Sequence, residues 1–214
     1  MPAKTYHIRV CTACGLRYPL ADGHGFGTRC PSCMGETRLV LSRNLVFEPK
    51  PDQPLTARAP EVGGKLGVLL DNIRSAWNVG SILRSADGFA FTHAYLCGIT
   101  PTPDHAAVTK TSLGAEESVS WSYHKDALKL VKGLKKEGWC IWALEEDDRA
   151  KSIQSMPAAG SNQPLVLVVG NEVTGIDPAL LDQCDEIFYI PMRGQKKSFN
   201  VAMAFSVAGF QMQK

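Results

Sequence analysis

The sequence lacks any apolar run of roughly 18 or more residues, the length that a membrane-spanning helix needs. Its first residues, MPAKTYHIRVC, contain neither the apolar core of a secretory signal nor an acylation motif. We therefore expect no membrane segment and a cytoplasmic location. In a reducing compartment, the seven cysteines should be metal ligands where they are paired and small buried residues where they stand alone.

A strong overall charge is also absent, since 23 Lys and Arg face 21 Asp and Glu, a formal net charge of +2. This balance does not by itself identify a nucleic-acid-binding protein. The charge is uneven, however: residues 1–60 hold eight basic and four acidic residues, a net charge of +4, which leaves −2 for the rest. A basic N-terminal part fits an anionic partner, and an ordinary solvated surface explains the excess equally well.

The chain of 214 residues is long enough for one medium-sized α/β domain and a small additional module. Residues 1–47 are the expected small module. Residues 48–64 contain four Pro and two Gly without apolar periodicity, which predicts a linker. From residue 65 to residue 214, short apolar runs alternate with helical patterns, which predicts an α/β domain of βαβ units with a mainly parallel sheet.

The elements of this larger domain can be placed from their apolar patterns. Strands are expected over residues 66–70, 94–97, 118–121, 140–144, 165–169 and 186–190. Helices are expected to begin near Asn78, Lys125, Asp177 and Ser198. Asp177 followed by Pro178 is a typical helix start, because Asp caps the first turn and Pro needs no N–H partner there.

Four cysteines form two C-x-x-C pairs, Cys11/Cys14 and Cys30/Cys33, with fifteen residues between the pairs. Four thiolates in a tetrahedron satisfy a structural zinc ion, and this spacing falls in the range of four-cysteine sites. We therefore predict a zinc ribbon, because so short a piece with few large apolar residues needs the metal to fold. His7 and His24 are spare candidate ligands, and the glycine-rich segment 23–27 is interpreted as a ribbon loop.

Three segments of the larger domain place polar residues where predicted strands end, the edge at which open α/β sheets bind ligands. The first holds Asn78 and Arg84 on one predicted helix, the second holds Glu172 in a glycine-flanked turn, and the third holds Ser198 and Asn200 before the last helix. Taken singly, each segment has a purely structural interpretation. Asn78, Ser198 or Asn200 could cap a helix, and Arg84 or Glu172 could be solvated surface.

Together the three segments resemble, in order and spacing, the three motifs of the SpoU/TrmH RNA 2′-O-ribose methyltransferases of the SPOUT superfamily. The first motif, N-x-G-x-I-x-R-x-A, is matched by Asn78, Gly80, Ile82, Arg84 and Ala86. The second, G-x-E-x-x-G, is matched by Gly170, Glu172 and Gly175. The third, I-P-M-x-G followed by S-L-N-V, is matched by Ile190, Pro191, Met192 and Gly194 and by Ser198, Asn200 and Val201, with Phe199 in place of leucine.

The resemblance implies features that patterning does not give. It implies a deep C-terminal trefoil knot, which is a rare exception to the rules for chain connections, and a homodimer formed through the knot region. It also implies that S-adenosylmethionine is held in the knot loops, largely by backbone groups. The residues expected to line that site are Leu96, Cys97, Gly98, Val169, Gly170, Ile190, Pro191, Met192, Ser198 and Phe199.

The implied reaction moves a methyl group from S-adenosylmethionine to a ribose 2′-hydroxyl in tRNA or rRNA, and it needs aligned reactants and removal of the hydroxyl proton. Arg84 is the expected main catalytic residue. Because a guanidinium stays protonated, we assign Arg84 phosphate binding and alkoxide stabilisation. Asn78 would orient Arg84 or the ribose, and Glu172 would position Arg84 or a loop. Ser198 and Asn200 would bind substrate or cofactor, and the zinc would be structural.

Two functions from other classes are the alternatives. One is a non-catalytic RNA-binding protein that retains the fold, and the other is a zinc-ribbon transcription or assembly factor whose larger domain only dimerises. The complete polar set of Asn78, Arg84, Glu172 and Asn200 favours the enzyme. A dinucleotide oxidoreductase is disfavoured, because no glycine fingerprint of the Rossmann type follows a predicted strand.

Overall fold

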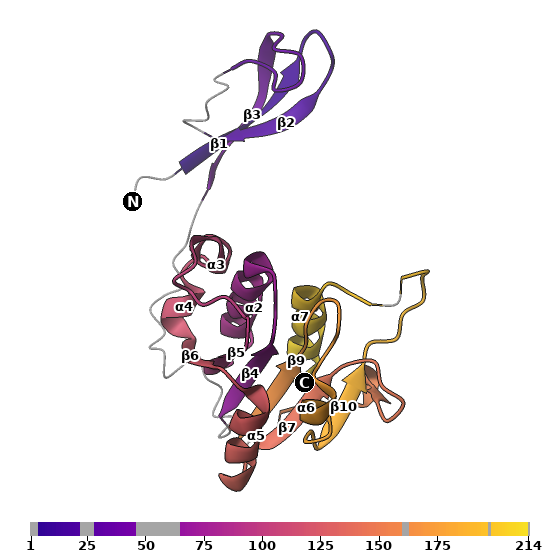
Figure 1. Cartoon of the computed structure of the whole chain (residues 1–214). Coiled ribbons are helices and arrows are strands. Elements are labelled where there is room, and N and C mark those ends of the chain that lie inside the picture. The colour runs from indigo at the N-terminus through magenta and orange to yellow at the C-terminus, as the bar shows by residue number, and fades with distance from the viewer. Residues whose placement is uncertain (1–3, 22–27, 46–64, 160–162, 197, 214) are drawn as a thin grey trace. The chain divides into compact units, whose positions relative to one another are not determined.

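The computed structural model describes residues 4–21, 28–45, 65–159, 163–196 and 198–213 (Figure 1). The chain divides into two compact units, Met1–Thr56 and Ala57–Lys214. The predicted linker over 48–64 and the loop 23–27 with His24 lie outside the described residues. Among the residues that are described, no helix is both long and apolar enough to cross a membrane.

The N-terminal unit is a three-stranded antiparallel sheet of strands β1 (Lys4–Cys11), β2 (Arg17–Ala21) and β3 (Thr37–Leu45), in the order β2-β1-β3. Its buried apolar residues are only Cys11, Leu20 and Cys30 among those described. So small an apolar interior provides little hydrophobic stabilisation. The unit therefore needs a further crosslink, which agrees with the expectation of a metal-bound module.

The larger unit is built on a seven-stranded sheet in which every described strand pair is parallel. The strand order is β6-β5-β4-β9-β7-β10-β8. The strands are β4 (Leu66–Asp71), β5 (His93–Cys97), β6 (Ser120–His124), β7 (Cys140–Leu144), β8 (Lys151–Ser152), β9 (Leu165–Val169) and β10 (Glu186–Tyr189). The predicted α/β class with a mainly parallel sheet is confirmed.

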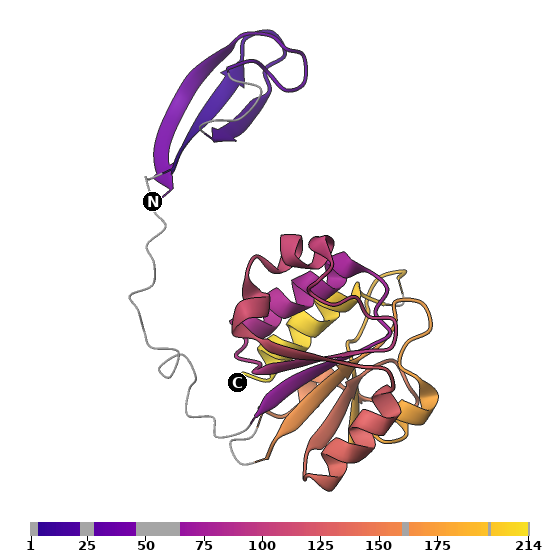
Figure 2. The same ribbon diagram turned by 60° about the vertical axis from the view of Figure 1, so that its left-hand side comes forward.

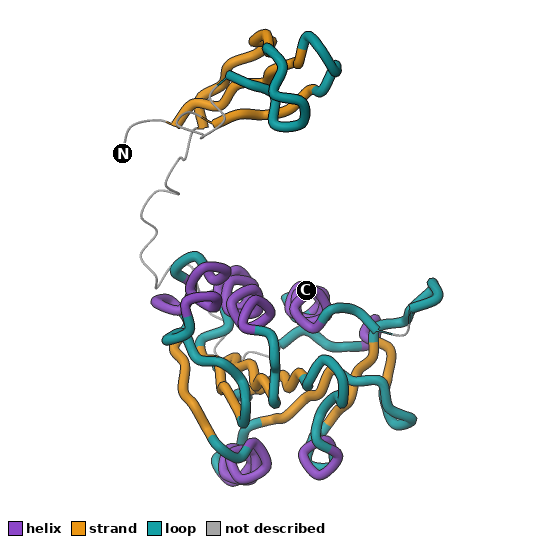
Figure 3. The backbone as a smooth tube through the Cα atoms, turned by 45° about the horizontal axis from the view of Figure 1, so that its top comes forward, coloured by secondary structure: helices purple, strands orange, loops and turns teal. Residues whose placement is uncertain are grey.

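Helices cover both faces of this sheet (Figures 2 and 3). One face carries α2 (Ala76–Gly88), α3 (Ala106–Ser112), α4 (Ala115–Ser118) and α7 (Val201–Gln211), and the other carries α5 (Ala127–Lys136) and α6 (Pro178–Leu181). Each face has its own core of buried apolar residues. The central strand β9, Leu-Val-Leu-Val-Val, is buried throughout because it contributes to both cores.

Most predicted elements lie where the sequence placed them, and the strands over 140–144 and 165–169 have the predicted bounds. The strand predicted over 118–121 is displaced, because Ser118 ends helix α4 and the strand β6 begins at Ser120. The last helix begins at Val201 with Asn200 as its N-cap, rather than near Ser198. The short helices α3 and α4 were not predicted, and neither has more than seven residues over which a period could show.

Gly80 of the first motif is required by the packing of α2 against α3. A Cβ atom at this position would lie 1.9 Å from Thr111 Oγ1 and 2.3 Å from the Val108 carbonyl oxygen. No side chain can be accommodated at such distances. The glycine therefore lets the two helices approach closely.

Candidate functional site

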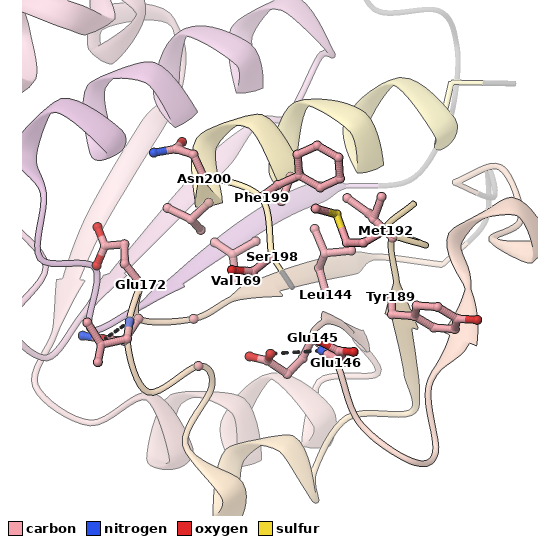
Figure 4. Close-up of a pocket in the computed structure, with 17 residues that line it drawn as sticks. Leu144, Glu145, Glu146, Val169, Glu172, Tyr189, Met192, Ser198, Phe199 and Asn200 are labelled. Carbon is pink, nitrogen blue, oxygen red and sulfur yellow. Dashed lines mark hydrogen bonds between the residues drawn. The ribbon is translucent and has the colours of Figure 1, made fainter. Parts of the chain in front are cut away.

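A cavity of about 400 Å³ opens beside the carboxyl ends of β7, β9 and β10, where ligands bind in open α/β sheets (Figure 4). Figure 4 shows Glu172 and Asn200 at one end of this cavity and Met192 and Tyr189 at the other. The lining consists of Leu144, Glu145, Glu146, Val169, Gly170, Asn171, Glu172, Val173, Gly175, Tyr189, Ile190, Met192, Ser198, Phe199, Asn200, Val201 and Ala204.

Three polar side chains from distant parts of the sequence form one hydrogen-bonded chain at the edge of this cavity. Asn78 Nδ2 donates to Glu172 Oε1 over 2.8 Å, and Asn200 Nδ2 donates to Asn78 Oδ1 over 3.0 Å. Asn200 Oδ1 in turn accepts from the Ala202 N–H over 3.0 Å and caps helix α7. We refer to Glu172, Asn78 and Asn200 as the polar chain, and it contains one residue from each sequence motif.

Glu172 is the accepting end of the polar chain. Besides the bond from Asn78, its carboxylate accepts from the backbone N–H groups of Arg74 (2.9 Å) and Ser75 (3.1 Å). Burial raises the pKa of Glu172, but the hydrogen bonds, led by that from Arg74, outweigh this effect and leave the pKa below its ordinary value. The ionised carboxylate therefore holds the loop that enters α2, which is also favourable near a helix N-terminus.

Arg84 lies on α2, six residues after Asn78, and its side chain is exposed. Within the described part of the chain, its guanidinium has no hydrogen-bond or ion-pair partner. Glu172 does not contact Arg84, so its position supports the alternative in which Glu172 orders a loop. An unengaged guanidinium in solvent is free to bind a phosphate of an incoming ligand.

The turn after β9 is shaped by the two glycines of the second motif. A Cβ at Gly170 would lie 2.3 Å from the Ile176 nitrogen, and Gly175 has a φ of +70° with Glu145 Oε2 2.5 Å from its ideal Cβ position. Glu145 Oε2 accepts from the Ile176 N–H over 2.9 Å, and Asn171 donates to the Asn72 carbonyl over 2.7 Å. The turn is thus tied to both neighbouring strand ends, and Glu172 is placed by a rigid frame.

In the N-terminal unit, the sulfur atoms of Cys11, Cys14, Cys30 and Cys33 all lie within 4.8 Å of one another. The Cys11–Cys33 and Cys14–Cys30 sulfur distances are 3.5 and 3.7 Å. Four sulfurs bound at about 2.3 Å to one zinc ion would lie about 3.8 Å apart. The donor set and spacing therefore fit a tetrahedral zinc ion.

Comparison with known proteins identifies the larger unit. Residues 65–210 match the model of the SpoU rRNA Methylase family. The chain belongs to this family. Its match includes all three motifs and therefore every member of the polar chain.

Similar proteins include other SpoU family members. A tRNA (guanosine(18)-2′-O)-methyltransferase of Thermus thermophilus is 27% identical over 163 residues, which cover 76% of this chain and 79% of the relative. A TrmH family tRNA/rRNA methyltransferase of Staphylococcus haemolyticus is 29% identical over 163 residues, 76% of this chain and 64% of the relative. Several relatives are thus longer, and the chain spans about two thirds or less of their length.

Among solved structures, an AdoMet-bound rRNA methyltransferase from Sinorhizobium meliloti has a TM-score of 0.65 at 22% identity, covering 72% of this chain and 59% of that one. A TrmH/SpoU tRNA-modifying enzyme from A. aeolicus has a TM-score of 0.62 at 24% identity, covering 72% and 78%. These likenesses show the fold and confirm the predicted SPOUT fold class.

Some of the residues predicted to bind the cofactor line the cavity. Val169, Gly170, Ile190, Met192, Ser198 and Phe199 line it, whereas Pro191 does not. Leu96 and Cys97 are fully buried at the end of β5, and Gly98 packs against Asn72. The structure therefore does not bring Leu96, Cys97 and Gly98 to the cavity. Of the predicted catalytic residues, Glu172, Ser198 and Asn200 line it and Asn78 is bonded to two of these three.

Other residues that line the cavity were not predicted from the sequence, chiefly Leu144, Glu145, Glu146 and Tyr189. The signal was available. Residues 144–146 follow directly on the predicted strand over 140–144, and the rule that ligands bind at the carboxyl ends of strands applies there as well. Tyr189 lies within the predicted strand over 186–190, and its exposure could not be inferred from an apolar pattern.

Proposed function

We propose that this SpoU family chain transfers the methyl group of S-adenosylmethionine to a ribose 2′-hydroxyl of tRNA or rRNA in the cytoplasm. The observation that carries the proposal is the polar chain, which joins one residue of each motif at the edge of a ligand-sized cavity. A protein that retained the fold only for RNA binding would have no need of this arrangement beside a cavity. The methyltransferase activities for which these relatives are named agree with it.

The cavity fits S-adenosylmethionine in size and chemistry. Its volume of about 400 Å³ falls within the range of small-molecule sites. Val169, Ile190, Met192 and Phe199 offer apolar surface suited to an adenine ring, and the exposed carboxylate of Glu146 suits a cation. The bound cofactor would supply an activated methyl group on a sulfonium.

Arg84 is assigned the recognition of RNA at the reacting nucleotide. Its exposed guanidinium can bind a phosphate next to the target ribose through two parallel N–H donors. The same positive charge stabilises the oxygen as the 2′-hydroxyl gives its proton to solvent water. Asn78 and Glu172 hold the helix on which Arg84 stands, since they fix its first turn through the polar chain. Arg84 acts on the ligand, and Asn78 and Glu172 are positioning residues.

For the N-terminal unit, we infer a structural zinc ion held by Cys11, Cys14, Cys30 and Cys33. The fit of the four sulfurs supports it. The small number of buried apolar residues in the described part of the unit supports it independently. Nothing in the proposed methyl transfer requires a metal, so the zinc would hold the fold of this unit.

We further infer a homodimer formed through helix α7. Met203, Val207 and Phe210 are 61%, 42% and 67% exposed and follow one another at intervals of four and three residues. This spacing places them on one side of the helix. An apolar stripe of this kind is expected to be covered by another protein surface, and a second copy of the chain supplies the same stripe.

The decisive experiment is methyl transfer by the purified full-length chain. Tritiated S-adenosylmethionine is incubated with RNA from cells that lack the protein, and the RNA is then hydrolysed with alkali. Because a 2′-O-methyl group blocks cleavage of the adjacent phosphodiester, the label should appear in alkali-resistant dinucleotides. Label in mononucleotides would indicate base methylation, and absence of label in every RNA fraction would contradict the proposed function.

A further inference from the structure

The N-terminal sheet has one side whose three arginines are not engaged by any residue that the structure describes. We propose that this side binds the phosphate backbone of RNA through three arginines around an apolar centre. It consists of Arg17, Arg38 and Arg43 together with Tyr6, Ile8, Val10 and Leu41, and we call it the arginine face. The inference rests on the proposed function, because it takes RNA as the substrate.

The strand register assembles the arginine face. Directly paired residues of antiparallel strands project to the same side of the sheet, as do alternate residues of one strand. On the central strand β1, the residues at positions 6, 8 and 10 alternate and therefore share a side. Their paired partners are Arg43 for Tyr6, Leu41 for Ile8, and both Arg17 and Arg38 for Val10. The register shifts by one residue of β3 between Ile8 and Arg9, and this shift brings Arg38 to the same side as Leu41 and Arg43.

The opposite side of the sheet carries the buried strand residues of the described part of the unit. Leu20 and the metal-ligand candidate Cys11 are buried there, 8% and 2% exposed. Arg9, on the same side, has its guanidinium engaged, since Nε donates to Thr37 Oγ1 over 2.7 Å and Nη2 donates to the Thr37 carbonyl over 3.0 Å. The charge of Arg9 is therefore engaged within the unit, unlike the charges on the arginine face.

The three guanidiniums of the arginine face are exposed and unengaged. Arg17, Arg38 and Arg43 have no ion pair or hydrogen bond with any residue that the structure describes. Glu36, the acidic residue among the described residues of this unit, pairs with Arg29 at 3.8 Å. Among the described residues of the unit, no acidic group compensates the positive charge of the face, which favours an anionic partner.

The centre of the face selects RNA among anionic partners. Tyr6, Ile8 and Val10 are half-buried in the middle strand and offer aromatic and aliphatic surface between the arginines. Single-stranded nucleic acids bind to such surfaces by placing bases on apolar side chains and phosphates on flanking basic groups. Planar guanidiniums suit phosphate oxygens, because they donate in pairs.

The test compares two variants of the full chain that lose the same three positive charges. The face variant carries Arg17→Gln, Arg38→Gln and Arg43→Gln. The control variant carries Lys129→Gln, Lys132→Gln and Lys136→Gln, three exposed residues of α5. Binding of fluorescein-labelled bulk tRNA and of an oligouridylate of roughly 15 nucleotides is followed by fluorescence anisotropy at several salt concentrations.

The face variant should bind both probes on the order of 10- to 100-fold more weakly, and the slope of log Kd against log salt should fall by about 2. A third variant, with Lys at the three arginine positions, should recover most of the affinity because it keeps the charge. In methylation assays the face variant should show a raised KM for RNA with an unchanged kcat and an unchanged Kd for S-adenosylmethionine.

Two outcomes would overturn this inference and leave the proposed function intact. One is methylation by the unaltered chain together with equal RNA binding by the face variant and the unaltered chain. The other is an equal loss of binding in the face and control variants, which would show a dependence on net charge alone. If the unaltered chain methylates no RNA but the face variant still binds RNA more weakly than the control, the proposed function fails and the arginine face stands.

Discussion

Asn78 donates its side-chain amide to the carboxylate of Glu172 over 2.8 Å, although 94 positions separate the two residues in the sequence. The bond ties the first turn of α2 to the turn that follows β9. Asn200, at the start of α7, is bonded to Asn78 over 3.0 Å and adds the third motif. The SpoU motifs are therefore parts of one hydrogen-bonded structure. We expect a substitution in one motif to alter the hydrogen bonds of the others.

Replacing Glu172 with Gln should lower the free energy of unfolding at neutral pH by about 1 kcal/mol, a modest value because the carboxylate is exposed. The folded state depresses the pKa of Glu172, so its contribution is complete above the ordinary value of 4.5 and is lost as the pH falls through the folded value. Urea unfolding at neutral and acidic pH measures this. Glu146→Gln is the control, and an equal deficit at both pH values would contradict the assignment.

Replacing Arg84 with Ala should lower kcat for methyl transfer by about 100-fold or more, because a charged donor to the developing oxyanion is lost. Arg84→Lys should retain part of the activity, since it keeps the charge but not the paired donors. The Kd for S-adenosylmethionine, measured by calorimetry, should change little in both. Lys132→Ala on α5 serves as the control, and normal turnover by Arg84→Ala would exclude a catalytic role.

Replacing Cys11 and Cys30 together with Ser should abolish zinc binding, since two of four thiolates are then missing. Metal analysis of the purified chain should give one zinc per chain before the change and none after it. The double variant should also lose the protection of the N-terminal unit from proteolysis. Cys140→Ser, outside the cluster, should keep its zinc, and tight zinc binding by the double variant would show that the ligands lie elsewhere.

Replacing Gly80 with Ala should destabilise the larger unit by about 1–3 kcal/mol, because the new methyl group would lie 1.9 Å from Thr111 Oγ1. Gly133→Ala, in the middle of α5 with no atom within 4 Å of the new methyl, should instead stabilise it by about 0.5–1 kcal/mol. Thermal unfolding of both variants checks the opposite signs. Equal melting temperatures would mean that the contact between α2 and α3 is easily rearranged.

Replacing Met203 and Phe210 with Glu should convert the protein to a monomer, because two charges would then have to be buried in the inferred interface. Sedimentation velocity at several concentrations measures the change. Ile99→Glu, at a site that is 65% exposed but lies outside α7, should leave the association state as it is. A monomeric unaltered chain would exclude the dimer.

Much of the larger unit could be predicted from its sequence, because buried parallel strands carry a strong local signal. The run Leu165–Val169 is apolar throughout and is followed by a glycine turn, so both its type and its end were evident. The displaced strand near Ser118 shows the limit. Gly114 adopts a φ of +92° and precedes one turn of helix. This turn includes Ser118, the residue at which the strand was expected to begin.

The members of the polar chain could be predicted from the sequence, but the hydrogen bonds between them could not. Asn200 had two interpretations, as a helix cap or as a site residue, and in the structure it is both. Its Oδ1 caps α7 while its Nδ2 binds Asn78. Sequence spacing carries no information on which of two donors faces which acceptor. The same limit applies to Leu96 and Cys97, whose distance from the cavity depends on how far β5 lies from β9 in the sheet.

The polar chain also has a direction, and Glu172 sets it. An ionised carboxylate can only accept, so Asn78 must turn its NH₂ group toward Glu172 and its oxygen toward Asn200. Asn200 must then present its own NH₂ group, which leaves its oxygen for the N–H groups of α7. One negative charge thus determines the orientation of two amides and the capping of a helix more than 25 residues further along the chain. The protonation state of Glu172 consequently affects the hydrogen bonds of the whole polar chain.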